Sequence, residues 1–120
     1  MFVQRPILNL MISKIKERVK TLATRVGNPF LTTTKMGAMI DKHHAESVSK
    51  AIHQAIHQGA SVICGSPNFM TCEDKWMGDS RDYTKELSGI YLSPTVLLCD
   101  DTMTIVNEEH FGPVMTSELL

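Results

Sequence analysis

The sequence lacks the features that mark phosphate-binding loops, cysteine-based sites and membrane spans. None of its seven glycines lies two residues from another, which excludes a G-x-G-x-x-G motif, and no P-loop is present. It has three cysteines and no C-x-x-C pair, so neither a disulfide framework nor a zinc or redox motif is predicted. No apolar run approaches the roughly 20 residues that a bilayer-spanning helix needs.

An excess of charge of one sign is also lacking. Twelve Lys and Arg residues face 13 Asp and Glu residues, for a formal net charge of −1. Because the basic residues do not gather on one stripe, nucleic acid is not an expected partner. The first six residues have neither the charged start nor the apolar centre of a signal peptide. Together with the odd cysteine count, this predicts a reduced, cytoplasmic compartment.

Hydrophobic periodicity predicts two helices. Residues 7–22 form the first, because its apolar side chains recur every three or four positions, at Leu8, Met11, Ile15, Val19 and Leu22. Residues 42–58 form the second, with Asp41 as the N-cap and Gly59 just past the end. Its predicted buried stripe is Ala45, Val48, Ile52 and Ala55.

Short apolar segments predict strands at residues 2–4, 60–64 and 91–99, with residues 103–106 and Val114 beginning further elements. Residues 66–88 are polar and irregular, which indicates a long surface loop. A helix followed by a buried apolar strand is typical of an α/β layer with a mostly parallel sheet. At 120 residues, the chain is one domain at most, or part of one.

Residues 107–114 combine two carboxylates, an aromatic ring, a glycine and a proline. Residues two apart in an extended segment point to the same side, so Glu109 and Phe111 are expected to share a face. A carboxylate there can accept two hydrogen bonds from a ribose diol, and the ring can pack on a flat heteroaromatic group. Spacing alone leaves open the alternative that Glu108 and Glu109 are solvated turn residues and Phe111 belongs to the core.

The histidines offer a weaker candidate site. His53 and His57 lie one helical turn apart and could share a metal ion, but Gln54 stands where the zinc-protease pattern requires glutamate. Both lie opposite the buried stripe of the second helix, so we expect them to face solvent and to bind no metal. His44 lies beside that stripe and is expected to pack against it.

The cysteines do not form a predicted catalytic site. Cys64 and Cys99 lie at the ends of apolar strands, where burial makes a thiol unreactive. Cys72 falls in the polar loop and is expected to be exposed and open to oxidation. We therefore predict no catalytic residue in this chain.

Beyond these patterns, the chain resembles the aldehyde dehydrogenase family over nearly its whole length. Six segments carry the resemblance in family order: residues 2–4, Gly27-Asn28-Pro29-Phe30, residues 35–40, residues 59–65, residues 89–97 and residues 108–114. Asp101-Thr102-Met103-Thr104 and Val114-Met115 are similar to the branch that acts on betaine aldehyde and 4-trimethylaminobutyraldehyde. The chain departs from the family pattern where Ala38 replaces a proline, Ser66 a glycine and His110 an aliphatic residue.

The resemblance implies part of a three-layer α/β catalytic domain with a mostly parallel sheet, spanning residues 1–120. It implies a homo-oligomeric parent enzyme that oxidises an aldehyde to a carboxylic acid with NAD or NADP. Glu109 would hydrogen-bond the nicotinamide ribose and Phe111 would pack near the nicotinamide ring.

The family's nucleophilic cysteine would lie upstream of Phe2, so the chain is expected to be inactive alone. The alternative is a non-catalytic α/β interaction module that associates with a dehydrogenase subunit.

Overall fold

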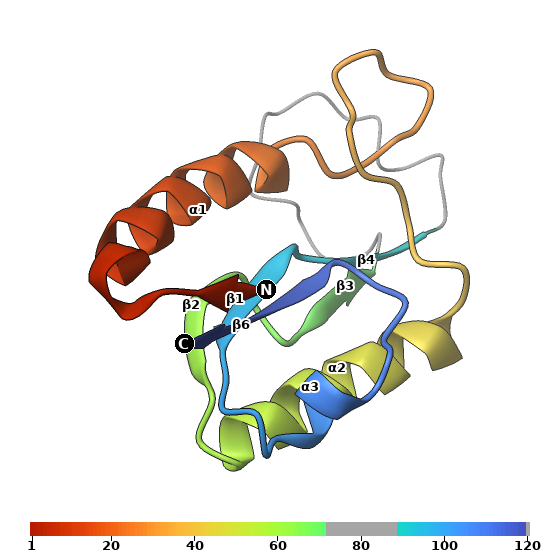
Figure 1. Cartoon of the computed structure of the whole chain (residues 1–120). Coiled ribbons are helices and arrows are strands. Elements are labelled where there is room, and N and C mark those ends of the chain that lie inside the picture. The colour runs from red at the N-terminus through yellow and green to blue at the C-terminus, as the bar shows by residue number, and fades with distance from the viewer. Residues whose placement is uncertain (72–88, 120) are drawn as a thin grey trace.

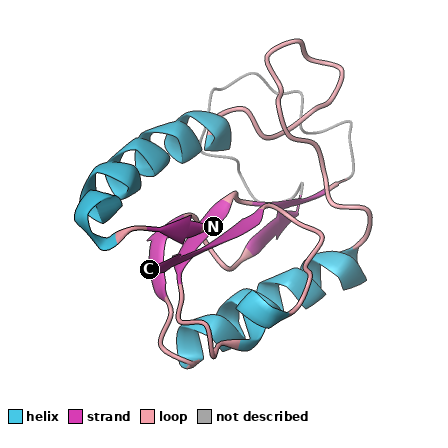
Figure 2. Cartoon of the chain, in the orientation of Figure 1, coloured by secondary structure: helices cyan, strands magenta, loops and turns pink. Residues whose placement is uncertain are grey.

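The computed structural model describes residues 1–71 and 89–119 as three layers (Figures 1 and 2). Helix α1 lies on one face of the central strands, and helices α2 and α3 lie on the other. The predicted three-layer α/β architecture is therefore confirmed. In chain order, the elements are β1 (Phe2–Val3), the 3-10 helix η1 (Arg5–Ile7), α1 (Leu8–Ala23), α2 (Lys42–His57), β2 (Ser61–Cys64), β3 (Phe69–Thr71), β4 (Ile90–Leu92), β5 (Thr95–Leu98), α3 (Thr104–Asn107) and β6 (Val114–Leu119).

The main sheet has four strands in the order β1-β6-β5-β2. Its β1–β6 and β5–β6 pairs are parallel, and its β2–β5 pair is antiparallel. The predicted, mostly parallel sheet is therefore confirmed. Register between β5 and β6 places Thr95 opposite Val114, directly after the Glu-Glu-His-Phe-Gly-Pro segment.

Two predictions about the strands need correction. Residues 91–99 do not form one strand, because Ser93 and Pro94 separate β4 from β5, and the two strands join different sheets. Proline has no N–H to donate to a ladder, so it ends a strand rather than continuing it. The predicted loop at 66–88 contains a strand, β3, in which Phe69 lies opposite Leu92 of β4. Residues 72–88, including Cys72, lie outside the described residues.

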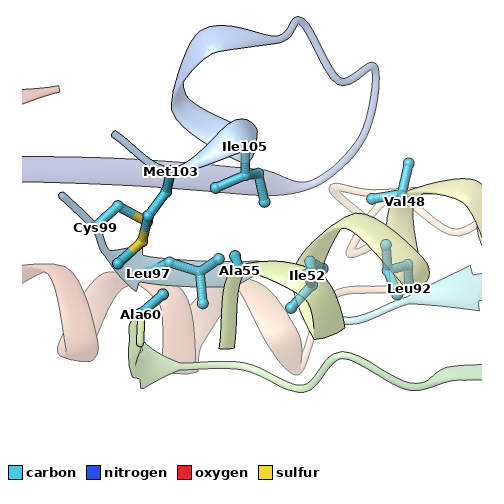
Figure 3. Packing of buried hydrophobic residues seen from close by; sticks show 9 residues of the cluster. All are labelled: Val48, Ile52, Ala55, Ala60, Leu92, Leu97, Cys99, Met103 and Ile105. Carbon is cyan, nitrogen blue, oxygen red and sulfur yellow. The ribbon is translucent and has the colours of Figure 1, made fainter. Parts of the chain in front are cut away.

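Helix α2 supplies much of the core, as its sequence predicted. Asp41 is extended at the N-cap, and its Oδ1 accepts a hydrogen bond of 2.7 Å from the His44 N–H. Gly59 follows the helix with φ of +106°, a conformation that glycine adopts without strain. All four residues of the predicted stripe are buried. Three of them belong to a cluster that also draws on β4, β5, α3 and their flanking residues (Figure 3): Val48, Ile52, Ala55, Ala60, Leu92, Leu97, Cys99, Met103 and Ile105.

Helix α1 forms where predicted, but it packs differently. Its apolar stripe is half-buried on the side of β2, and the helix has no fully buried residue. No side chain caps its first turn. Within residues 1–71 and 89–119, no helix has the length and hydropathy that crossing a bilayer requires.

Candidate functional site

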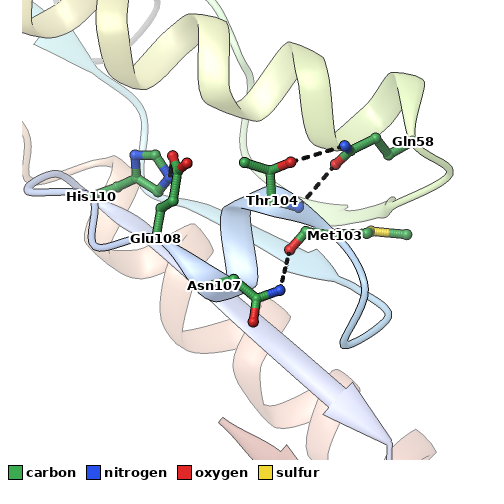
Figure 4. A network of polar contacts seen from close by, with 6 residues as sticks. All are labelled: Gln58, Met103, Thr104, Asn107, Glu108 and His110. Carbon is green, nitrogen blue, oxygen red and sulfur yellow. Dashed lines mark hydrogen bonds and ion pairs between the residues drawn. The ribbon is translucent and has the colours of Figure 1, made fainter.

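The candidate site begins with helix α3, which is fixed to the C-terminal end of α2. The Gln58 Nε2–H donates to Thr104 Oγ1 at 3.0 Å, and the Thr104 N–H donates to Gln58 Oε1 at 3.2 Å (Figure 4). The N-cap residue of α3, Met103, makes no side-chain cap. The C-cap residue of α2 therefore satisfies the Thr104 N–H in the first turn of α3, and this pair of bonds sets where the following segment starts.

The turn that precedes α3 is held by its own side chains. Asp100 Oδ1 accepts from the Thr102 N–H at 3.1 Å and from the Thr102 hydroxyl at 2.9 Å. These bonds, the backbone one foremost, lower the pKa of the Asp100 carboxyl. Asn107 Nδ2 donates to the carbonyls of Asp101 and Met103, at 2.8 and 3.1 Å. The chain thus enters residues 108–113 from a fixed point.

Residues 111–113 are held from behind by α2 and β5. The His44 ring Nε2 makes a hydrogen bond to the Phe111 carbonyl oxygen. A Cβ atom added to Gly112 would lie 3.1 Å from both methyl carbons of Val48, so the backbone at Gly112 packs directly on α2. The Thr95 N–H donates to the Pro113 carbonyl at 2.8 Å.

The two predicted site residues lie on the exposed side of this segment. Glu109 is exposed, and Phe111 is 72% exposed. His110 between them faces inward, with a side chain only 17% exposed. This out-in-out alternation is what an extended segment requires. Glu109 and Phe111 are therefore both open to solvent, on either side of the inward-facing His110.

The electrostatics of the segment differ on its two sides. His110 Nε2 lies 4.0 Å from Glu108 Oε2 and is buried without a hydrogen-bond partner (Figure 4). Within residues 1–71 and 89–119, the Glu109 carboxylate has neither a hydrogen bond nor an ion pair. An unengaged carboxylate and an exposed ring fit a ribose diol and a flat heteroaromatic group. Because Gly112 has no side chain, the backbone that carries Glu109 and Phe111 lies directly against α2 at this position.

The remaining candidates do not form a site in the described part of the chain. His53 and His57 are exposed, as predicted. No three His, Cys, Asp or Glu side chains among residues 1–71 and 89–119 lie close enough together to hold a metal ion. Burial raises the pKa of the Cys64 and Cys99 thiols, and the Glu118 charge adds to the effect at Cys99. A raised thiol pKa opposes nucleophilic reactivity.

Sequence reasoning missed the partners of two α2 residues. His44 was expected only to pack beside the buried stripe, whereas its ring reaches a carbonyl 67 residues away. Gln58 was expected only to end the helix, whereas it holds Thr104, 46 residues away. Neither contact leaves a pattern in the sequence, because each depends on how α2 packs against a distant segment.

Comparison with known proteins adds the family. A sequence model described as the aldehyde dehydrogenase family matches residues 1–118. The chain is 39% identical over 116 residues to 4-trimethylaminobutyraldehyde dehydrogenase of Oryzias latipes, covering 96% of this chain and 21% of that protein. It is 40% identical over 116 residues to 4-trimethylaminobutyraldehyde dehydrogenase A of Danio rerio, covering 96% and 20%.

Solved structures agree with the sequence comparisons. Betaine aldehyde dehydrogenase of Staphylococcus aureus in complex with NAD+ matches with a TM-score of 0.78 and 32% identity, covering 99% of this chain and 21% of that one. Aldehyde dehydrogenase C of Pseudomonas syringae, in a mutant complexed with NAD+ and octanal, matches with a TM-score of 0.78 and 26% identity, covering 100% and 22%. The chain spans about a fifth of the length of these relatives. It belongs to the aldehyde dehydrogenase family.

Proposed function

We propose that this chain is part of the catalytic domain of an NAD(P)-dependent aldehyde dehydrogenase and supplies contacts to the nicotinamide side of the cofactor. The parent enzyme would oxidise an aldehyde to a carboxylic acid. The observation that carries the proposal is the shared exposure of Glu109 and Phe111 on a segment fixed from behind by α2 and β5. Family membership supplies the reaction class.

The two side chains have different tasks in this proposal. The Glu109 carboxylate accepts hydrogen bonds from the two hydroxyls of the nicotinamide ribose, and charge strengthens these bonds. The Phe111 ring packs beside the nicotinamide ring and excludes water from one of its sides. The bound cofactor supplies the chemistry by accepting a hydride. The chain's own contribution is to hold the ribose and orient the ring. This raises the rate of hydride transfer, because it fixes the reacting geometry.

The proposed substrate class is an aldehyde that carries a trimethylammonium group. Support comes from relatives named for 4-trimethylaminobutyraldehyde and from structural neighbours named for betaine aldehyde. Glu109 and Phe111 would not discriminate NAD from NADP, because the extra phosphate of NADP lies on the adenosine half. The neighbours' complexes with NAD+ support NAD as the cofactor.

Two nucleosides test the nicotinamide-side assignment. We expect nicotinamide riboside to shift the backbone amide signals of residues 108–112 in the 15N-labelled chain, and adenosine to shift them much less. Both ligands carry the same ribose and no phosphate, so the ring is what differs. Equal shifts from adenosine, or no shift from nicotinamide riboside, would contradict the assignment.

Matched variants sharpen this test. Glu109→Gln is expected to weaken nicotinamide riboside binding about tenfold, since it removes a charged acceptor. Glu108→Gln removes the same charge one residue away and is expected to change binding less than twofold. Phe111→Ala should also weaken binding, whereas a Glu108→Gln effect as large as that of Glu109→Gln would point to net charge instead.

We further propose that the chain alone supplies no nucleophile. Burial keeps the Cys64 and Cys99 thiols protonated by raising their pKa values, and a thiol attacks an aldehyde as the thiolate. Incubation of the purified chain with betaine aldehyde and NAD+ is expected to give no NADH. Turnover that disappears when any one of its three cysteines is replaced by serine would overturn this proposal.

Association with further dehydrogenase polypeptide, in a homo-oligomer of the parent enzyme, is proposed on the basis of a sheet edge. Strand β2 is an outer strand of the main sheet, and its Val62 is 42% exposed. Outer strands with exposed apolar side chains favour pairing with other chains. Size-exclusion chromatography checks the association, and a clean monomer at high concentration would count against it.

A reduced, cytoplasmic compartment is also proposed, because Cys64 and Cys99 are free thiols.

A further inference from the structure

His44 occupies a fixed place on α2. It is the third residue of the helix, and its backbone N–H is held by Asp41 Oδ1 at 2.7 Å. Its side chain lies on the same face as that of Val48, one turn later, and this face meets the backbone at Phe111 and Gly112. The position of the His44 ring is therefore set by the start of the helix and not by a mobile loop.

The hydrogen bond from His44 reaches the backbone just after the two proposed cofactor contacts and before strand β6. Its acceptor is the carbonyl oxygen of Phe111, so the bond constrains the peptide unit from which the Phe111 side chain projects. The next two residues are also held, because the Gly112 backbone packs on Val48 and the Pro113 carbonyl accepts a hydrogen bond from the Thr95 N–H. The part of the segment that lies N-terminal to Phe111 has no comparable bond from α2 in the described residues.

We infer that His44 is a positioning residue, which orients Glu109 and Phe111 for the nicotinamide ribose by holding the Phe111 carbonyl. The purpose of this positioning rests on the proposed function, whereas the hydrogen bond from His44 to Phe111 is independent of it. A carbonyl oxygen only accepts hydrogen bonds, so the His44 Nε2 atom must carry the proton. Protonation of the ring adds a proton at Nδ1 and leaves the Nε2–H donor in place.

The first test reads the bond without any ligand. Long-range 1H–15N correlation spectra of the chain should show the neutral His44 ring as the Nε2–H tautomer. In His44→Ala, the 13C shift of the Phe111 carbonyl should move, while His43→Ala, which changes an exposed neighbour on the same helix, should leave it in place. An Nδ1–H tautomer, or an unmoved carbonyl signal in His44→Ala, would overturn the inference.

The second test reads positioning through binding. His44→Ala is expected to weaken nicotinamide riboside binding about fivefold, and His44→Gln is expected to restore it to within about twofold, since the amide N–H can donate to the same carbonyl. A purely structural role would instead make both variants lose thermal stability with no difference between them in binding.

The two tests also separate this inference from the proposed function. If the unaltered chain fails to bind nicotinamide riboside, the proposed function fails. The tautomer and the carbonyl shift still decide whether His44 holds Phe111. If His44→Ala does not fold, the tautomer of the unaltered chain and the His44→Gln variant decide the inference.

Discussion

Helices α1 and α2 are both 16 residues long and both carry an apolar stripe, yet only α2 buries its stripe. Five α2 residues are buried, and a side-chain cap at Asp41 starts the helix, whereas α1 has no buried residue and no side-chain cap. The difference shows that a matching hydrophobic period predicts a helix but not how much of it is covered. Coverage depends on what packs against the helix.

The two layers also differ in charge. Residues 1–40 hold seven of the 12 basic residues but only one of the 13 acidic ones, so the α1 layer is strongly positive and the rest is negative. Beside α1, a shallow groove is lined by Lys14, Ile15, Arg18, Val19 and Met115. The α2 layer, by contrast, closes a hydrophobic cluster, and His44 and Gln58 bond to the Phe111 carbonyl and to Thr104. We therefore expect stability to reside mainly in the α2 layer.

Truncation of matched isoleucines should give the largest difference between the layers. Ile52 in α2 is 0% exposed, so Ile52→Ala should cost about 2–5 kcal/mol of unfolding free energy through lost burial and a cavity. Ile15 in α1 is half-buried, so Ile15→Ala should cost about 1 kcal/mol. Urea unfolding monitored by circular dichroism measures both. Equal losses would contradict the comparison.

A glycine pair tests the junction of β2 and β5 against the loop after α1. Gly65 has φ of +95°, and an added Cβ would lie 2.5 Å from the Pro94 carbonyl oxygen. Gly65→Ala should therefore cost about 2–3 kcal/mol through backbone strain and overpacking. Gly37 has open space around it, so Gly37→Ala should stay within about 0.5 kcal/mol. Thermal unfolding of the two variants measures the difference in stability. Similar melting temperatures would contradict the claim that Gly65, unlike Gly37, has no room for a side chain.

The bonds from α2 to α3 should contribute less. Gln58→Ala removes both hydrogen bonds to Thr104 and should cost about 1 kcal/mol, since each bond is exposed and net contributions are modest. Gln54→Ala changes the same residue type one turn earlier, with no side-chain bond in the described residues, and should be close to neutral. Amide exchange of residues 104–108 reports the local effect. Unchanged protection in Gln58→Ala would show that α3 does not depend on α2.

The two thiols should show the smallest effect, in a Cys72→Ser background. Burial raises both pKa values from the usual 9.0; the Lys16 charge partly opposes this at Cys64, and the Glu118 charge adds to it at Cys99. Iodoacetamide should therefore modify Cys64 faster than Cys99, and both more slowly than free cysteine. Lys16→Gln should slow Cys64 alone. Mass spectrometry of timed samples measures the rates, and the reverse order would contradict the assigned charges.

The same shifts set a pH dependence with a definite sign. A thiol whose pKa is raised on folding keeps its proton more tightly in the folded state than in the unfolded state. The resulting stability is present below about pH 9 and is lost as the pH rises through the folded pKa. Unfolding free energy should fall above pH 9 and recover partly in Cys99→Ala.

Local structure could be predicted from the sequence because its causes are local. The Asp41 cap, the α2 stripe and the end at Gly59 lie within one helix, and the alternation around His110 needs only an extended backbone. The split at Pro94 was missed, although its cause is also local, since proline cannot continue a ladder. The bonds of His44 and Gln58 could not be read, because they join residues 67 and 46 positions apart and depend on tertiary packing.

Mapping of NAD+ on the labelled chain tests the central claim most directly. If residues 108–112 form the nicotinamide-side contact and His44 supports it, NAD+ should shift the amide signals of that segment and of the first turn of α2. The α1 layer, residues 1–40, should stay unchanged despite its positive charge. Shifts concentrated in residues 1–40, as expected for phosphate attracted to basic side chains, or no shifts at all, would contradict the account.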